Sequence, residues 1–283
     1  VQNGGLEKMR RPVGRRAGSA ERFAIAAVIV VGLCVNMDAQ RGRGGGAAAQ
    51  PAATTPKSQA PAGTLLDLTG YWLSIVTEDW RYRMMTMPKG EHPGMPLNAE
   101  GNKIANAWDP AKDEAAGEQC RAYGAAGVMR MPGRIHITWE SDTTLKVETE
   151  AGTQTGLFVF GKPPADTSAP TWQGVSVAWW ELAGRPARGR GAPAAAQYGS
   201  LKVVTTRMKP GYVQKNGVPY GENAVLTDYF PPPNEANGDS WLILTHIVDD
   251  PQYLNLPLVR STHYKKLPDS AASQWSPEPC SAR

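Results

Sequence analysis

The sequence predicts an all-β, mainly antiparallel fold, a single up-and-down barrel of about 8–10 strands with a short helical insertion near residues 97–120. Apolar and polar residues alternate along most of the chain after residue 64, which is the spacing of strands with one buried face. Turn-forming residues separate these runs, and only one region has helical spacing. About 220 residues follow residue 63, a length that suits one domain.

The clearest strand signal is a hairpin. In RIHITWE, Ile135, Ile137 and Trp139 alternate with polar residues, and after the turn SDTT the run LKVETE alternates again. Seven further runs are expected to be strands, namely residues 71–76, QTGLFVF, GVSVAWWEL, LKVVTTRM, NAVLTDYF, WLILTHIV and LVRSTHYKKL, and WRYRMMTM is the candidate for a tenth strand.

The helical insertion is expected in LNAEGNKIANAW. Asn98 can cap its N-terminus, and Leu97, Ile104 and Trp108 fall on roughly one helical face. Residues 183–199, rich in Ala, Gly, Pro and Arg, are expected to form a low-complexity loop within the domain of residues 64–283.

The segment before this domain has the composition of an export signal. From Met9 the chain is first basic, and then AIAAVIVVGLCV is apolar and uncharged. About 12 apolar residues are too few to span a bilayer but suit a secretory signal peptide. We therefore expect a signal peptide over residues 1–39, a disordered Gly/Ala/Pro-rich tether over 40–63, and a periplasmic or extracellular mature chain without a membrane span.

The charge balance gives no support for nucleic-acid binding. The chain has 30 basic and 26 acidic residues, and residues 1–39 hold six and three of them, which leaves 24 basic and 23 acidic residues. A domain so close to neutral lacks the basic surface that recognises a phosphate backbone.

Two cysteines, Cys120 and Cys280, remain after residue 39. An exported protein meets an oxidising compartment, where an even number of cysteines favours a disulfide. We expect this bond to fasten the C-terminal tail, and the alternative is two separate thiols.

Gly70-x-Trp72, on the first expected strand, resembles the start of lipocalin-like (calycin) barrels. The resemblance implies a barrel in which the Trp closes one end and packs against a basic residue of the last strands. Arg260 is taken as that partner of Trp72, with Lys265 and Lys266 as the alternatives. The stretches AWDPAKDEAAGEQCRAYGAAG, TWQG and KNGVPYGENAVLT are similar to those of uncharacterised exported bacterial proteins, a similarity that implies no activity.

The segment TEDWRYR is the first candidate site. If it is a strand, Arg81 and Arg83 share one face and can clamp a carboxylate or phosphate, while Glu78 and Trp80 share the other. The alternative is a row of exposed ion pairs that contribute less than about 1 kcal/mol each.

Tryptophan and histidine provide the other candidates. Several of the nine Trp, including Trp139, stand beside an acidic residue, which is one way to bind or cleave a sugar, although neighbours on a strand face opposite sides. His136, His246 and His263 lie on expected strands without the close spacing of a metal motif, and His246 is expected to be buried and bonded to a Thr or a carbonyl. We expect no metal and no cofactor.

The sequence favours a binding protein over an enzyme, because no nucleophile, phosphate-loop or zinc motif occurs. The first hypothesis is a barrel that holds a small apolar or aromatic ligand in its interior, near Trp72, Trp139 and His246. The alternatives are a structural or protein-interaction module of the cell envelope and a carbohydrate-binding protein or hydrolase. The oligomeric state is left open.

Overall fold

The computed structural model describes residues 60–61, 64–162, 169–183, 198–233 and 237–283. The expected signal peptide over residues 1–39, most of the tether over 40–63 and most of the loop over 183–199 lie outside the described residues. None of the described helices is long and apolar enough to cross a membrane.

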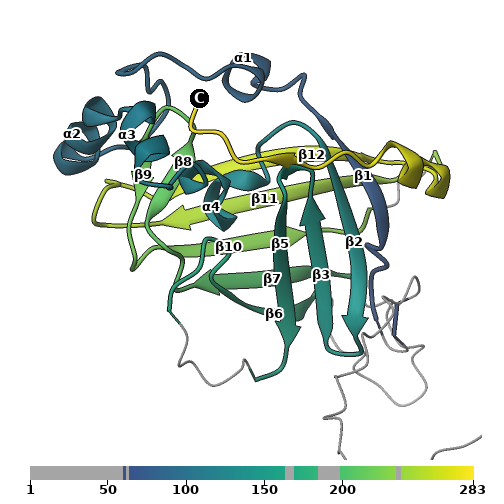
Figure 1. Ribbon diagram of the computed structural model, residues 1–283. Coiled ribbons are helices and arrows are strands. Elements are labelled where there is room, and N and C mark those ends of the chain that lie inside the picture. The colour runs from purple at the N-terminus through teal and green to yellow at the C-terminus, as the bar shows by residue number, and fades with distance from the viewer. Residues whose placement is uncertain (1–59, 62–63, 163–168, 184–197, 234–236) are drawn as a thin grey trace, which may run out of the picture. The chain divides into compact units, whose positions relative to one another are not determined.

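Nine strands form a closed barrel (Figure 1), and these are the nine runs that the alternating pattern predicts. Each strand pairs with the barrel strand that precedes it and the one that follows it in the chain, and the last strand pairs with the first. In chain order they are β1 (Gly70–Ile75), β2 (Arg134–Ser141), β3 (Thr144–Thr149), β5 (Gln154–Phe160), β6 (Val175–Ala183), β7 (Tyr198–Thr206), β10 (Val225–Phe230), β11 (Trp241–Asp249) and β12 (Leu258–Lys266).

One neighbouring pair of the barrel, β5 and β6, is parallel, and the other pairs are antiparallel. This follows from the odd number of strands, because a closed ring of strictly alternating directions needs an even number. β5 and β6 are therefore not the two strands of a hairpin, although they are consecutive in the barrel.

The predicted tenth strand is wrong, because WRYRM forms the helix α1 (Trp80–Met84). Asp79, at φ 53°, turns the chain into this helix. The guanidinium of Arg83 then reaches inward and donates to the carbonyl of Ile75 at 2.6 Å and to that of Arg130 at 3.0 Å. These tertiary contacts outweigh the strand-like pattern of the segment.

The predicted helical insertion is confirmed. Asn98 caps α2 (Ala99–Ala107), with its side-chain oxygen accepting from the amide of Gly101 at 2.8 Å. The other helices of the insertion are α3 (Pro110–Ala115), the 3-10 turn η1 (Arg121–Tyr123) and α4 (Ala125–Val128), and a small hairpin of β8 (Gly211–Gln214) and β9 (Val218–Tyr220) packs beside them (Figure 1).

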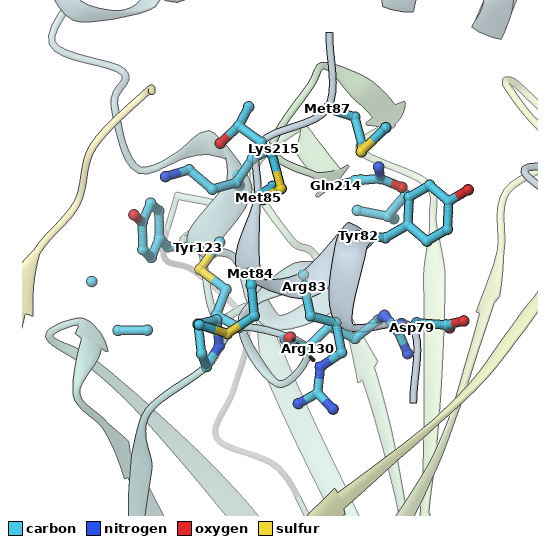
Figure 2. A pocket seen from close by; sticks show the side chains of 18 of the residues that line it. Asp79, Tyr82, Arg83, Met84, Met85, Met87, Tyr123, Arg130, Gln214 and Lys215 are labelled. Carbon is cyan, nitrogen blue, oxygen red and sulfur yellow. Dashed lines mark hydrogen bonds and ion pairs between the residues drawn. The ribbon is translucent and has the colours of Figure 1, made fainter. Parts of the chain in front are cut away.

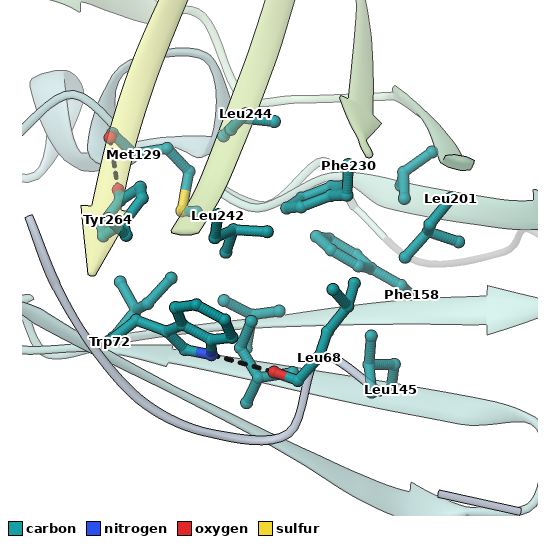
Figure 3. Close-up of a cluster of buried hydrophobic side chains, with 14 of the residues drawn as sticks. Leu68, Trp72, Met129, Leu145, Phe158, Leu201, Phe230, Leu242, Leu244 and Tyr264 are labelled. Carbon is teal, nitrogen blue, oxygen red and sulfur yellow. Dashed lines mark hydrogen bonds between the residues drawn. The ribbon is translucent and has the colours of Figure 1, made fainter. Parts of the chain in front are cut away.

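Side chains fill the barrel interior (Figure 3). The α4 segment enters one end, where Val128 and Met129 join the core and Tyr264 donates to the carbonyl of Met129 at 2.5 Å. The buried cluster consists of Leu68, Trp72, Val128, Met129, Ile135, Ile137, Trp139, Leu145, Val147, Phe158, Ala178, Leu201, Val203, Phe230, Leu242, Leu244 and Tyr264.

At the other end Trp72 is fully buried and donates to the carbonyl of Leu68 at 2.9 Å (Figure 3). The ammonium of Lys266, not the guanidinium of Arg260, lies over its ring, 4.6 Å from the centroid, and donates to the carbonyl of Thr69. The choice of Arg260 is therefore corrected. Arg260 and Lys266 are an even number of positions apart on β12 and so face the same side of the strand. The register pairs Lys266 with Trp72, which leaves Arg260 toward the α4 end of the barrel.

The C-terminal tail runs back along the barrel after β12. It forms the 3-10 helix η2 (Asp269–Gln274) and then β13 (Glu278–Pro279), which pairs in parallel with β4 (Ala151–Gly152). The expected disulfide joins Cys120 and Cys280 across 160 positions of the sequence. It fastens the tail to the helical insertion beside η1.

Candidate functional site

A cleft of about 780 Å³ lies at the α4 end of the barrel, outside the filled interior, and we call it the end cleft (Figure 2). One side is made by α1 and the loop that follows it, and the base by the segment from η1 through α4 to β2. The rest of the wall consists of the C-terminal tail with β13, the strand β4 that pairs with β13, and β8 of the small hairpin. The volume is within the range of sites that hold a small organic molecule.

Methionine dominates the apolar lining of the end cleft. Five methionine side chains line it, namely Met84, Met85, Met87, Met95 and Met131. Met84 ends α1 and Met85 follows it, and the two residues are 54% and 56% exposed, so they form an open rim. Methionine is flexible and polarizable, and a surface built from it can adapt to apolar molecules of different shape.

Three arginines reach the end cleft, and one of them is structural. The side chain of Arg83 is only 1% exposed and is an ion-pair partner of Glu78. It also donates to the hydroxyl of Ser74 and to two backbone carbonyls. Burial lowers the pKa of Arg83, an effect that Tyr264 and Glu78 oppose. Its donors are nearly all used, so Arg83 holds α1 in place over the barrel end.

Arg130 and Arg260 lie beside it with donors to spare. Arg130 donates to Asp79 at 3.1 Å and to the carbonyl of Ser261 at 3.1 Å. Arg260 donates to the carbonyl of Gly94 at 2.7 Å and to that of its neighbour in sequence, Val259, at 3.0 Å, and its third contact is with the sulfur of Met95 at 4.0 Å. Burial and the nearby charge of Arg130 lower the pKa of Arg260, an effect that the charge of Asp79 opposes. The two cations thus face the same end of the cleft.

His246, one member of a buried histidine–aspartate pair, borders the end cleft. His246 contacts the carboxylate of Asp228 through Nδ1 at 2.6 Å and the carbonyl of Ala126 through Nε2 at 3.0 Å, and the two side chains are 3% and 4% exposed. Because both partners accept, the ring donates from both nitrogens when the carboxylate is ionised. Burial lowers the pKa of His246, but the charge of Asp228 and these hydrogen bonds outweigh burial and raise it. The pair ties β10 and β11 to α4.

The candidate site residues of the TEDWRYR segment separate from one another. Arg83 lines the end cleft, whereas Arg81 is exposed and its guanidinium lies 3.6 Å from Glu91. The two arginines therefore form no common clamp, because α1 is a helix and not a strand. Glu78 pairs with Arg83, and Trp80 is 59% exposed on α1 without lining the cleft.

The other candidates divide between the core and the cleft. Trp72 and Trp139 are buried in the barrel interior, with Trp139 packed against Phe160 at 5.4 Å between ring centroids. His246 is buried and bonded to a backbone carbonyl, as its sequence context predicts, and it also borders the end cleft. Its carboxylate partner Asp228 comes from another strand and carries no signal in the sequence.

Sequence reasoning missed the residues that give the end cleft its chemistry. Arg130 and Met131 stand in GVMRMPG, and Met84 and Met85 stand in MMTM. Two clusters of methionine next to arginine were the available signal. Nothing in the sequence indicated that a segment of the insertion and the loop after α1 would meet over the end of the barrel.

The barrel interior itself offers little room. A cavity of about 20 Å³ lies beneath α4, bordered by polar groups that include Thr149, Gln173, Ser176, Thr205 and Asp228. That volume accommodates a single water molecule and no organic ligand.

No group of three or more His, Cys, Asp or Glu side chains that could hold a metal ion occurs among the described residues. In comparisons with protein-family models, curated proteins and solved structures, no match to this chain was found. The resemblance to lipocalin-like barrels accordingly extends to a closed β-barrel and no further.

Proposed function

We propose that this chain is an exported protein that binds a small, mainly apolar or aromatic molecule in the end cleft. The observation that carries the proposal is a concave site of about 780 Å³ with five methionine side chains in its lining. Apolar walls with a few convergent polar groups are the usual makeup of small-molecule sites. The ligand would gain affinity by burying apolar surface against the thioethers.

The end cleft is a better place for this ligand than the barrel interior, where the sequence alone would put it. The interior is occupied by packed side chains, and the cavity that borders Asp228 there is about 20 Å³. A ligand in the interior would have to displace the α4 segment, which Tyr264 and His246 hold by hydrogen bonds to the backbone.

Export is supported by the basic and then apolar composition of residues 1–39 and by the disulfide between Cys120 and Cys280. Disulfides persist in oxidising compartments and are rare in the cytosol.

An apolar ligand fits the end cleft better than a sugar. No tryptophan of the described residues lines the end cleft. Its aromatic residues are Tyr82 and Tyr123. Of the three acids in the lining, Asp79 and Glu150 are held in ion pairs with arginines, so the described residues of the cleft do not offer the pair of free carboxylates expected for cleaving a glycoside.

The proposal is tested with N-phenyl-1-naphthylamine, a neutral apolar dye whose fluorescence rises on transfer from water to an apolar site. We expect saturable binding to the wild type and at least tenfold weaker binding to the double variant Met84→Asp/Met85→Asp, because two carboxylates in the rim make apolar burial unfavourable. Leu256→Asp is the matched control, since Leu256 is 68% exposed and does not line the cleft. Failure of the wild type to bind, or equal binding by the double variant, would contradict the proposal.

A further inference from the structure

We propose that the ligand of the end cleft is an amphipathic monoanion, with an apolar body against the methionine rim and a carboxylate or sulfonate group held by Arg260 and Arg130. This inference rests on the proposed function and names the class of ligand that the same site selects.

Arg260 has unused capacity to bind an anion. Its guanidinium has five N–H donors, and two of them go to backbone carbonyls, those of Gly94 and Val259. A third, longer contact joins the guanidinium to the sulfur of Met95 at 4.0 Å. No carboxylate of the described residues lies within ion-pair distance of Arg260. Half-burying a guanidinium without an acidic partner costs folding free energy, and an anion bound from solution offsets that cost.

Two of the three acids that border the cleft are already bound to arginines other than Arg260. Asp79 is held by Arg130 at 3.1 Å, and Glu150 is held by Arg134 at 3.2 Å. Glu150 also accepts from the backbone amides of Arg134 at 2.8 Å and of Ser276 at 2.9 Å. These bonds direct its carboxylate to the tail and to β2.

The second cation reinforces the first. Arg130 and Arg260 both line the cleft, and the charge of Arg130 lowers the pKa of Arg260 more than the charge of Asp79 raises it, so repulsion between the two cations is only partly relieved. An anion between them removes this repulsion and gains charge-assisted hydrogen bonds. Among the Arg, Lys, Asp and Glu side chains that line the cleft, four are basic (Arg83, Arg130, Lys215, Arg260) and three are acidic (Asp79, Glu150, Glu278). The imidazole of His246 also lines it and is paired with Asp228, so one negative charge on the ligand matches the excess of one positive charge.

The arrangement also sets the orientation of the ligand. Arg260 is near the start of β12, and its guanidinium contacts Gly94 and Met95 of the loop that follows α1. The rim of Met84 and Met85 is open to solvent. The anionic group is thus bound beside Gly94 and Met95, and the apolar body lies against the thioethers of the rim.

The test compares N-phenyl-1-naphthylamine with 1-anilinonaphthalene-8-sulfonate, which has the same aromatic skeleton and an added sulfonate. We expect the wild type to bind the sulfonate about tenfold more tightly than the neutral dye, because one charge-assisted hydrogen bond strengthens binding by about this factor. This preference should fall as salt is raised from 0.05 to 0.5 M, while binding of the neutral dye stays constant.

The variant Arg260→Met should lose the preference and keep binding of the neutral dye, and Arg260→Lys should restore part of it. Arg81→Met is the matched control, because Arg81 is exposed on α1 and lies outside the cleft lining. Unchanged binding of the neutral dye by Arg260→Met shows that the cleft is intact in that variant.

The possible failures are distinguishable. If the wild type binds both dyes equally, or if Arg260→Met keeps the preference, the anion inference is wrong and the proposed function stands. If the wild type binds neither dye, the proposed function fails as well.

Discussion

The pair of Asp228 and His246 should make a large and pH-dependent contribution to the stability of the barrel, and Asp228→Asn tests it. Both side chains are almost fully buried, and their atoms lie 2.6 Å apart. Removing one partner of a buried pair costs about 3–5 kcal/mol, and because asparagine retains a hydrogen-bonding oxygen we expect the lower figure, about 3 kcal/mol.

The pH dependence has a definite sign. The pKa of His246 is raised in the folded protein, since Asp228 and the carbonyl of Ala126 outweigh the effect of burial and the nearby charge of Arg130. Its stabilising contribution is therefore fully present below the unfolded pKa of about 6.5 and is lost as pH rises through the folded value. The difference in unfolding free energy between wild type and Asp228→Asn should be largest near pH 6 and shrink at higher pH.

Urea unfolding followed by tryptophan fluorescence at a series of pH values measures this difference. Burial lowers the pKa of His92 and of His136, so both act in the opposite direction, but they are the same in the two proteins and cancel. A loss below about 1 kcal/mol, or a difference that does not change with pH, would refute the reasoning.

Three further predictions concern the ends of the fold. Replacing Cys120 and Cys280 by serine should lower the free energy of unfolding by about 2–5 kcal/mol, measured by urea unfolding of wild type and variant, and no effect would mean that the tail is held by its other contacts alone. Lys266→Met should lower the free energy of unfolding by about 2 kcal/mol, because the cation over the Trp72 ring is lost, whereas Arg260→Met should lower it by less than about 1 kcal/mol. A larger loss for Arg260→Met than for Lys266→Met in thermal melts would contradict the assignment of Lys266 as the partner of Trp72. Asn98→Ala should cost about 1 kcal/mol as a lost helix cap, seen in the same melts, and an unchanged midpoint would contradict the capping bond.

The sequence predicted the barrel because each strand has its own local signal. Alternation along β2 or β11 reports directly which side chains are buried, and the turns between strands mark where the chain reverses. The run after Asp79 was wrongly predicted to be a strand, because its structure depends on the burial of Arg83. That burial depends on contacts with Ser74, Ile75 and Arg130, which lie outside the run. Such tertiary contacts leave no periodicity to read.

The candidate site was harder to predict for the same reason. Trp72 and Trp139 draw attention as large aromatic residues, yet an inward position in a narrow barrel makes them core. The cation at Trp72 was assigned to the wrong residue of β12, although the register decides it, because Trp72 pairs with Lys266 across the β1–β12 seam. Pairing between the first and the last strand is not encoded locally, so it could not be read from the sequence.

The most direct test of a ligand site in the end cleft is a titration of protein labelled with ¹³C at the methionine methyl groups, followed by nuclear magnetic resonance. With 1-anilinonaphthalene-8-sulfonate as the probe, the methyl signals of Met84, Met85 and Met131 should shift together and saturate, while those of the buried Met129 and Met208 stay in place. Shifts led by Met129, which belongs to the barrel core, or no saturable shift at the cleft methionines, would contradict this placement of the ligand.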